Sequence, residues 1–487
     1  MMDTRQQACR AGLWPMLGLT AAALAARLFH LDYRGFWTDE FHTLDAILRP
    51  LPDLIMDRLH AGHLPTYFIL LKLWTLVAGT SEWALRFPSA VAGAMLVPAV
   101  WLFARKSVSN GLLLALMSMA AFNGMAVWSS QEARMYSMLT VAATLSHYFY
   151  LRTMERGGWR TWTAYYFWLL IAVSLQPAMV AFYAGHAAFA MFAGRAFPRH
   201  RRAALAGAAV ALTMGAIGGA VYVSINREMQ FDGFHLPRIA ILWGRASLVV
   251  FGSSPDAFWM RGVDEIMLLV CAIGGIIGWR KLRRSQADID GQIGPYVFLK
   301  FCFYASIVPL CLMCVFGIFT LHIIGPGRYL LPASAPLWIL ALWGVAQYPV
   351  RTSHMMAFLI AVIVATGLGN QWYHRGSGAR EAAIFLREQA APGDPVFMRH
   401  STIFPLILNY YGAAQVDICL IPYKASNDDV LRMIRERATG KTQSWIFEYR
   451  DQQKRLSRLA AESSESVTLM ERYGFNEARV FQITTNN

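Results

Sequence analysis

Long apolar runs constrain the fold of this chain more than any other feature. A helix that crosses a bilayer needs about 20 mostly apolar residues. Runs of about that length lie at 11–29, 87–104, 111–129, 135–151, 161–176, 177–194, 203–224, 264–279, 297–320, 328–347 and 354–370. Of the 487 residues, 56% are hydrophobic and only 15% are charged, whereas a soluble domain is about a quarter charged. We therefore predict a mainly α, polytopic membrane protein with about 11 spans.

Basic residues gather in short clusters between these runs, and they predict the orientation. The clusters are Arg5/Arg10, Arg105/Lys106, Arg152/Arg156/Arg160, Arg195/Arg199/Arg201/Arg202, Arg280/Lys281/Arg283/Arg284 and Arg351. Lys and Arg are enriched in cytoplasmic loops, so we expect a cytoplasmic N-terminus in the inner (cytoplasmic) membrane. The loops predicted to face the periplasm are 30–86, 130–134, 225–263 and 322–327, together with the C-terminal tail. Topology thus accounts for the net charge of +14, and we predict contacts with membrane lipids and no nucleic-acid partner.

The predicted orientation depends on whether the segment 65–79 crosses the membrane. This segment is apolar, but a crossing there would turn every later basic cluster outward. We interpret it as an amphipathic helix at the outer surface, within a first periplasmic loop that spans 31–86. A crossing segment remains the alternative.

The composition changes after residue 370, where charged residues become frequent. We predict two domains, a transmembrane domain over 1–370 and a small periplasmic α/β domain over 371–487. Helical periodicity covers 381–390 and 428–438, and strand patterns lie at 395–398, 416–421, 444–448 and 478–483. The sequence has no Gly-rich phosphate loop of the nucleotide-binding type.

Three groups of polar residues lie where predicted outward loops meet the membrane. Asp39 and Glu40 follow the first apolar run, with Trp37 and His42 beside them. The second and third groups contain Glu132, Arg134 and Tyr136, and then Arg328 and Tyr329. Ionisable groups at a membrane boundary are costly and usually functional. An acid on one loop and arginines on two others suit a general base and a phosphate clamp.

Structural roles are the alternative for each of these residues. Asp39 could cap a short helix that begins near Thr43. Arg134 and Arg328 could be snorkelling anchors at the interface, and Lys72 in 65–79 could be either an anchor or a phosphate ligand.

The motifs, taken together, resemble those of the GT-C membrane glycosyltransferases that use polyprenyl-phosphate sugars, a group that includes the protein O-mannosyltransferases and the lipid A aminoarabinose transferase. They occur in the family's order over roughly residues 11 to 340. The matching pieces are Trp37-Thr38-Asp39-Glu40, His63-Leu64-Pro65-Thr66-Tyr67-Phe68, Glu82-Trp83-Ala84-Leu85-Arg86-Phe87-Pro88-Ser89-Ala90, Gln131-Glu132-Ala133-Arg134-Met135-Tyr136 and Arg328-Tyr329-Leu330-Leu331-Pro332. Relatives mostly have His-Pro-Pro where this chain has His63-Leu64-Pro65.

The resemblance implies a GT-C fold with juxtamembrane helices in the first outer loop. It also implies that Asp39 activates the acceptor and that a lipid-linked donor places its phosphate near Arg134 and Arg328. We add Glu40 as a second catalytic candidate. The further donor-phosphate candidates are Lys72, Tyr136 and Tyr329, and the substrate-binding candidates are His63, Trp37, His42 and Glu132. We assign no metal ligand, although a divalent cation stays open as a cofactor.

The function predicted from these residues is inverting transfer of a sugar from a polyprenyl-phosphate donor to an acceptor hydroxyl at the periplasmic side. The acceptor is a lipid, a glycan or a protein. A transporter or flippase of a lipid-linked glycan is the alternative, although such proteins often contain internal repeats and none is visible in this sequence. A non-catalytic scaffold of the cell envelope is a third hypothesis.

Overall fold

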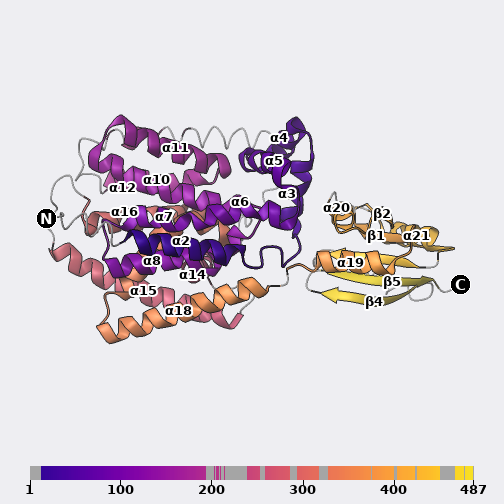
Figure 1. Ribbon diagram of the computed structural model, residues 1–487. Coiled ribbons are helices and arrows are strands. Elements are labelled where there is room, and N and C mark those ends of the chain that lie inside the picture. The colour runs from indigo at the N-terminus through magenta and orange to yellow at the C-terminus, as the bar shows by residue number, and fades with distance from the viewer. Residues whose placement is uncertain are drawn as a thin grey trace. The chain divides into compact units, whose positions relative to one another are not determined.

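The computed structural model of the chain (Figure 1) describes residues 12–192, 239–252, 258–285, 293–316, 327–374, 376–399, 403–422, 425–441, 443–449, 467–475 and 478–485, with isolated positions between 202 and 213. Its contacts divide the chain into two units. The helical unit comprises Met1–Leu31, Pro50–Gly79 and Trp83–Tyr373. The α/β unit comprises Asp32–Arg49, Thr80–Glu82 and His374–Asn487. This division differs from a single boundary at 370/371, because two segments of the first loop group with the C-terminal part.

Every secondary-structure element described in the helical unit is a helix. They are α2 (Leu13–Leu28), α4 (Leu51–His60), α5 (Thr66–Ala78), α6 (Glu82–Ala94, whose first residue belongs to the α/β unit), α7 (Leu96–Ala104), α8 (Asn110–Phe122), α9 (Gly124–Ser130), α10 (Tyr136–Arg156), α11 (Trp159–Leu175), α12 (Met179–Phe192), α14 (Ile239–Phe251), α15 (Phe258–Ser285), α16 (Pro295–Phe316), the 3₁₀ helix η3 (Gly327–Ala333), α17 (Ser334–Val345) and α18 (Val350–Tyr373). In this unit α2 packs on α8, α8 on α7, α7 on α10 and α10 on α11 (Figure 1).

Several of these helices are long and apolar enough to cross a membrane. Within the described residues four pass by length and composition, and a fifth is added if the bent pair α8 and α9 forms one span. The prediction of a mainly α, multi-pass membrane protein is confirmed, while the number of about 11 spans stays a prediction. The predicted span 203–224 lies almost entirely outside the described residues.

Two local features differ from the sequence expectation. The predicted loop 225–263 contains the helix α14, whose 13 residues are apolar but too few to read as a span. The predicted run 111–129 is broken by a bend of 43° between α8 and α9. Asn123 causes this break, because its side-chain oxygen accepts a hydrogen bond from the amide of Ala126 at 3.1 Å and so begins a new helix.

The segment 65–79 forms α5, which has 13 residues. A helix of that length spans about 20 Å, whereas the hydrocarbon core of a bilayer is about 30 Å thick. Leu70, Leu73, Leu76 and Val77 are exposed on it. A surface position fits these two observations better than a crossing, and it stays a prediction.

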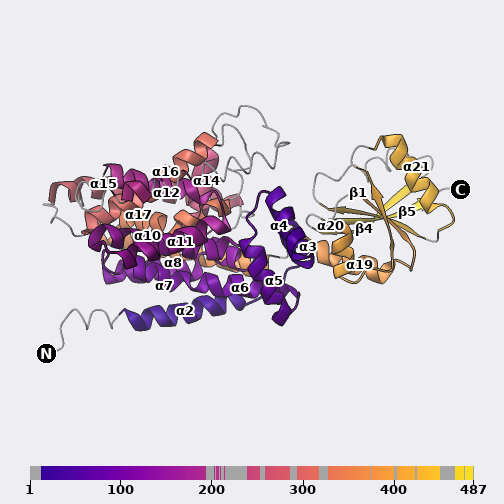
Figure 2. The same ribbon diagram turned by 90° about the horizontal axis from the view of Figure 1, so that it is seen from above.

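The C-terminal part of the α/β unit is a five-stranded mixed sheet. It contains α19 (Ala379–Gln389), β1 (Pro395–Arg399), α20 (Ile403–Tyr410), β2 (Asp417–Ile421), α21 (Asn427–Ala438), β3 (Ser444–Tyr449), β4 (Val467–Phe475) and β5 (Ala478–Thr485). The strand order is β2-β1-β3-β5-β4, with β1 parallel to β2 and β3, and β5 antiparallel to β3 and β4. Figure 2 shows α21 on one face of the sheet and α19 on the other. Both faces are therefore covered, and every residue of β1 and β3 is buried.

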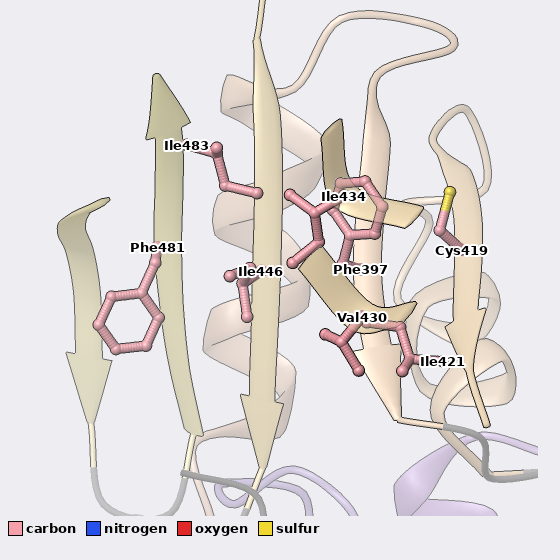
Figure 3. Close-up of a cluster of buried hydrophobic side chains, with 8 residues drawn as sticks. All are labelled: Phe397, Cys419, Ile421, Val430, Ile434, Ile446, Phe481 and Ile483. Atoms are coloured by element: carbon pink, nitrogen blue, oxygen red, sulfur yellow. The ribbon is translucent and has the colours of Figure 1, made fainter. Parts of the chain in front are cut away.

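The hydrophobic core under α21 follows from the periodicities of its sequence (Figure 3). Residues two apart on a strand share one face of a sheet, and residues four apart share one face of a helix. Its members are Phe397, Cys419, Ile421, Val430, Ile434, Ile446, Phe481 and Ile483. Strand and helix patterns therefore meet in one layer, and the predicted α/β character of this region is confirmed.

Candidate functional site

Two arginines that are far apart in the sequence lie beside one tyrosine ring in the helical unit. The guanidinium carbon of Arg134 is 5.9 Å from the ring centre of Tyr136, and that of Arg328 is 5.2 Å from it. The Tyr329 ring meets the Tyr136 ring edge-on at 6.2 Å. We call Arg134, Tyr136, Arg328 and Tyr329 the arginine–tyrosine cluster. The structure thus brings together the second and third polar groups of the sequence, and two cations at one place attract an anion.

The backbone around Arg134 is fixed by polar contacts inside the helical unit. Its carbonyl accepts a hydrogen bond from the Ser89 hydroxyl at 3.0 Å, and the Ser137 hydroxyl donates to the Ser89 carbonyl at 2.9 Å. Upstream, the Gln131 side chain donates to the carbonyls of Arg27 and Phe29 at 3.1 and 2.8 Å. These hydrogen bonds fix the position from which the Arg134 side chain starts.

Arg27 stabilises the α8–α9 bend from which this backbone continues. Its guanidinium is fully buried and donates to the carbonyls of Ala23, Ala120 and Ala121 at 3.1, 2.9 and 2.8 Å, respectively. It also donates to the Ser130 hydroxyl at 3.2 Å. Carbonyls at the end of a helix lack intrahelical partners. Arg27 therefore satisfies two carbonyls at the end of α8 inside the helical unit.

Phe68 on α5 connects the cluster to α4 and to His63. The guanidinium carbons of Arg58 and Arg134 lie 5.1 and 5.9 Å from its ring centre, and the His63 ring lies 6.1 Å from it. Lys72 follows Phe68 by four residues, so both share one face of α5. The predicted residue Lys72 therefore lies on α5, the helix whose Phe68 ring contacts Arg134. The predicted residue His63 precedes α5 and contacts the same ring.

The Tyr136 hydroxyl is a buried polar group without a hydrogen-bond partner among the described residues. The side chain is fully buried, and within the described part of the chain its oxygen makes no hydrogen bond. A buried hydroxyl without a partner costs about 1–3 kcal/mol. Unpaired groups of this kind are typical of sites that bind a ligand.

Asp39 lies on α3 (Thr38–Leu48) in the α/β unit. It is the second residue of the helix and is partly exposed, and its carbonyl accepts a hydrogen bond from the Thr43 hydroxyl at 3.0 Å. The expectation that Asp39 caps a helix beginning near Thr43 is wrong, because α3 begins at Thr38. The positive end of the helix dipole favours an ionised carboxylate in the first turn, which is the state that a general base requires.

The neighbours of Asp39 have distinguishable surroundings. Glu40 is fully buried, and its carboxylate accepts a hydrogen bond from the backbone amide of Trp37 at 3.4 Å. That geometry gives Glu40 the reciprocal half of a capping box. His42 is half-buried and shares a helix face with Asp39, since it follows by three residues. Glu132 is buried beside the cluster, where its carbonyl accepts from the Arg134 amide at 2.8 Å.

Arg58 was missed by the sequence reasoning. It is buried to 4% exposure on α4 and pairs with the adjacent Asp57. An adjacent Asp and Arg in a polar stretch of sequence do not indicate a binding site. The structure shows that Arg58 and Arg134 both contact the Phe68 ring. Among the described residues, no three His, Cys, Asp or Glu side chains are arranged to hold a metal ion.

The fold and this cluster define a multi-pass helical membrane protein with two neighbouring arginines in its helical unit and a second, α/β unit. Residues 62–217 match the family model described as Dolichyl-phosphate-mannose-protein mannosyltransferase. The resemblance to these membrane glycosyltransferases is thereby confirmed over that part of the chain, which contains His63, Lys72, Arg134 and Tyr136. No curated protein matches the sequence.

Solved structures of two kinds are similar along most of the chain. ArnT from Cupriavidus metallidurans bound to undecaprenyl phosphate is 12% identical, with 96% of this chain and 97% of that chain covered and a TM-score of 0.43. The apo form of the same protein gives a TM-score of 0.44 at 12% identity, with 97% and 98% covered. The Archaeoglobus fulgidus oligosaccharyltransferase, tethered to an acceptor peptide, is 11% identical, with 96% and 74% covered and a TM-score of 0.49.

Proposed function

We propose that this protein is a GT-C glycosyltransferase that moves a sugar from a polyprenyl-phosphate donor to an acceptor hydroxyl at the periplasmic side of the inner membrane. The observation that carries the proposal is the arginine–tyrosine cluster, of which Arg134 and Tyr136 lie in the segment that matches a mannosyltransferase family model. Two guanidinium groups and an unpaired buried hydroxyl offer donors to the oxygens of one phosphate.

In this proposal the cluster stabilises the leaving group. As the bond between the anomeric carbon and the phosphate oxygen breaks, negative charge grows on the polyprenyl phosphate. Arg134 and Arg328 provide positive charge for it, and Tyr136 donates a hydrogen bond. Lys72 and Tyr329 complete the donor-phosphate candidates, with His63 and Glu132 as candidates for the substrate.

Asp39 is the proposed base. It takes the proton from the acceptor hydroxyl while that oxygen attacks the anomeric carbon from the face opposite the phosphate, which inverts the configuration at that carbon. Glu40 supports it by capping α3, and Trp37 and His42 are candidates for contacts with the acceptor. The acceptor class, whether lipid, glycan or protein, stays open, as does assistance by a divalent cation.

The test compares Asp39→Asn with Asp45→Asn. Asp45 lies on the same helix and forms a 2.7 Å ion pair with Arg49, so it controls for loss of a carboxylate from α3. With purified protein, a polyprenyl-phosphate sugar and an acceptor, mass spectrometry should detect product from the wild type and from Asp45→Asn, and none from Asp39→Asn. Binding of polyprenyl phosphate should persist in all three.

Two results would contradict the proposal. Product formation by Asp39→Asn at the wild-type rate would remove this residue from the mechanism. Movement of the lipid-linked sugar across vesicle membranes without any change in mass of the acceptor would favour the flippase. A reporter enzyme fused to the C-terminus that is active only in the periplasm tests the orientation independently.

A further inference from the structure

The helix that carries Asp39 is attached at its N-terminal end to the C-terminal fold within the α/β unit. Phe36 and Phe41 flank the first turn of α3, and neither side chain is exposed. Their rings pack against the α20 end of that fold, where the Phe36 ring lies 5.3 Å from that of Tyr410 and the Phe41 ring 5.9 Å from that of Tyr411. Aromatic pairs at these distances add about 0.5–1.5 kcal/mol each beyond burial.

The Tyr411 hydroxyl connects this aromatic contact to the partly buried carboxylate of Glu82. It accepts a hydrogen bond from the backbone amide of Phe36 at 2.8 Å and donates one to Glu82 at 2.6 Å. The other oxygen of Glu82 accepts from Arg380 at 2.9 Å. Hydrogen bonds to charged groups are stronger than neutral ones, so the chain of contacts fixes the entry of α3 firmly.

Arg380 also holds the segment that leads to α3. Its guanidinium donates to the carbonyl of Asp32 at 2.9 Å and to that of Tyr33. Gly35 permits this approach, because a Cβ atom there would lie 2.6 Å from the Cβ of Arg380. A second attachment lies at the carboxyl end of β3, where the Thr38 hydroxyl donates to the Tyr449 hydroxyl at 3.4 Å.

We propose that Glu82, Tyr411 and Arg380 are positioning residues that set the orientation of the Asp39 helix, so that the C-terminal α/β fold is a working part of the reaction. The inference rests on the proposed role of Asp39 as base. It gives a role to Glu82, which begins the motif at residues 82–90 and has no part in the proposed transfer reaction. A displacement of about 1 Å in a catalytic group can reduce a rate about a hundredfold.

The test uses Tyr411→Phe in the full-length protein, with Tyr410→Phe as the matched control. Both changes remove one phenol oxygen from the end of α20 and keep the ring. The Tyr410 hydroxyl donates to the carbonyl of Thr80 at 3.0 Å, a residue outside α3. Tyr411→Phe should lower kcat about tenfold or more, with the KM for the polyprenyl-phosphate sugar unchanged within about twofold, because the arginine–tyrosine cluster is intact. Tyr410→Phe should leave kcat unchanged within about twofold.

Hydrogen exchange of peptides covering 32–49 gives a readout that does not need activity. The amide of Phe36 should exchange faster in Tyr411→Phe, because it loses its acceptor, and at the wild-type rate in Tyr410→Phe. Equal kcat and equal exchange in the two variants, with Asp39→Asn inactive in the same assay, would overturn the positioning role alone. Wild-type turnover by Asp39→Asn would instead overturn the proposed function on which the inference rests.

Discussion

Tyr136→Phe separates binding from stability at the arginine–tyrosine cluster. The hydroxyl is buried and makes no hydrogen bond among the described residues, so its removal breaks none of the hydrogen bonds within them. We expect the resistance of the protein to unfolding to stay equal or to rise, since the burial of an unpaired hydroxyl costs about 1–3 kcal/mol. The ring contacts with Arg134 and Arg328 remain, because they need only the aromatic face.

The ligand should respond in the opposite direction. A hydrogen bond to a charged group contributes about 1.5–3 kcal/mol, and about 1.4 kcal/mol is a tenfold change in affinity. The Kd for a polyprenyl phosphate of defined length should therefore rise by roughly ten- to a hundredfold. Titration of the detergent-solubilised protein by native mass spectrometry measures this Kd, and thermal denaturation in the same detergent measures the stability.

Tyr150→Phe is the matched control for this comparison. Tyr150 lies on the same helix, is equally buried, and donates a hydrogen bond to the carbonyl of His186 at 2.8 Å. Its replacement should lower stability by about 0.5–1.5 kcal/mol and leave the Kd unchanged. Unchanged affinity in Tyr136→Phe, or a stability loss as large as that of Tyr150→Phe, would refute the assignment of the Tyr136 hydroxyl to the phosphate.

The remaining predictions concern three other positions. Arg27→Met should destabilise the protein by about 3–5 kcal/mol, since it removes a buried guanidinium and leaves helix-end carbonyls unpaired; a melting temperature like that of the wild type would contradict this. Gly35→Ala should lower activity and raise exchange in 32–49, because its Cβ would lie 2.6 Å from the Cβ of Arg380, and a fully active variant would argue against the close approach. Burial raises the pKa of the Cys419 thiol, with the charge of Asp417 adding to the shift. The thiol therefore stays protonated at neutral pH, and peptide mapping should show slow alkylation that accelerates only as the pH rises; rapid alkylation at pH 7 would disprove it.

The class of the protein could be predicted from the sequence because its determinants are local. A run of apolar residues must leave water whatever surrounds it. The strands β1, β2, β3 and β5 were also predicted within a residue or two, since alternation and β-branched residues act over short stretches. Arg134 and Arg328 could be singled out because a charge at the start of an apolar run is costly in any fold.

Elements with weak local patterns were missed. The helix α20 has only eight residues, and a proline such as Pro405 normally indicates a loop in a sequence. In the structure Pro405 lies in the first turn of α20, where proline is tolerated. The strand β4 carries charged residues and an irregularity between Glu471 and Tyr473 that breaks its alternation. Pairing with β5 determines that strand, and this pairing is not visible in its own sequence.

The sequence alone determined that the chain lies in a membrane and which charged residues stand at its boundaries, because transfer free energies belong to single residues and short segments. Tertiary structure alone decided that Arg134 and Arg328 share the ring of Tyr136, that the Tyr136 hydroxyl makes no hydrogen bond among the described residues, and that the Asp39 helix joins the C-terminal fold through Tyr411. These are contacts between segments distant in the chain, and their energies depend on geometry that only packing of the whole chain sets.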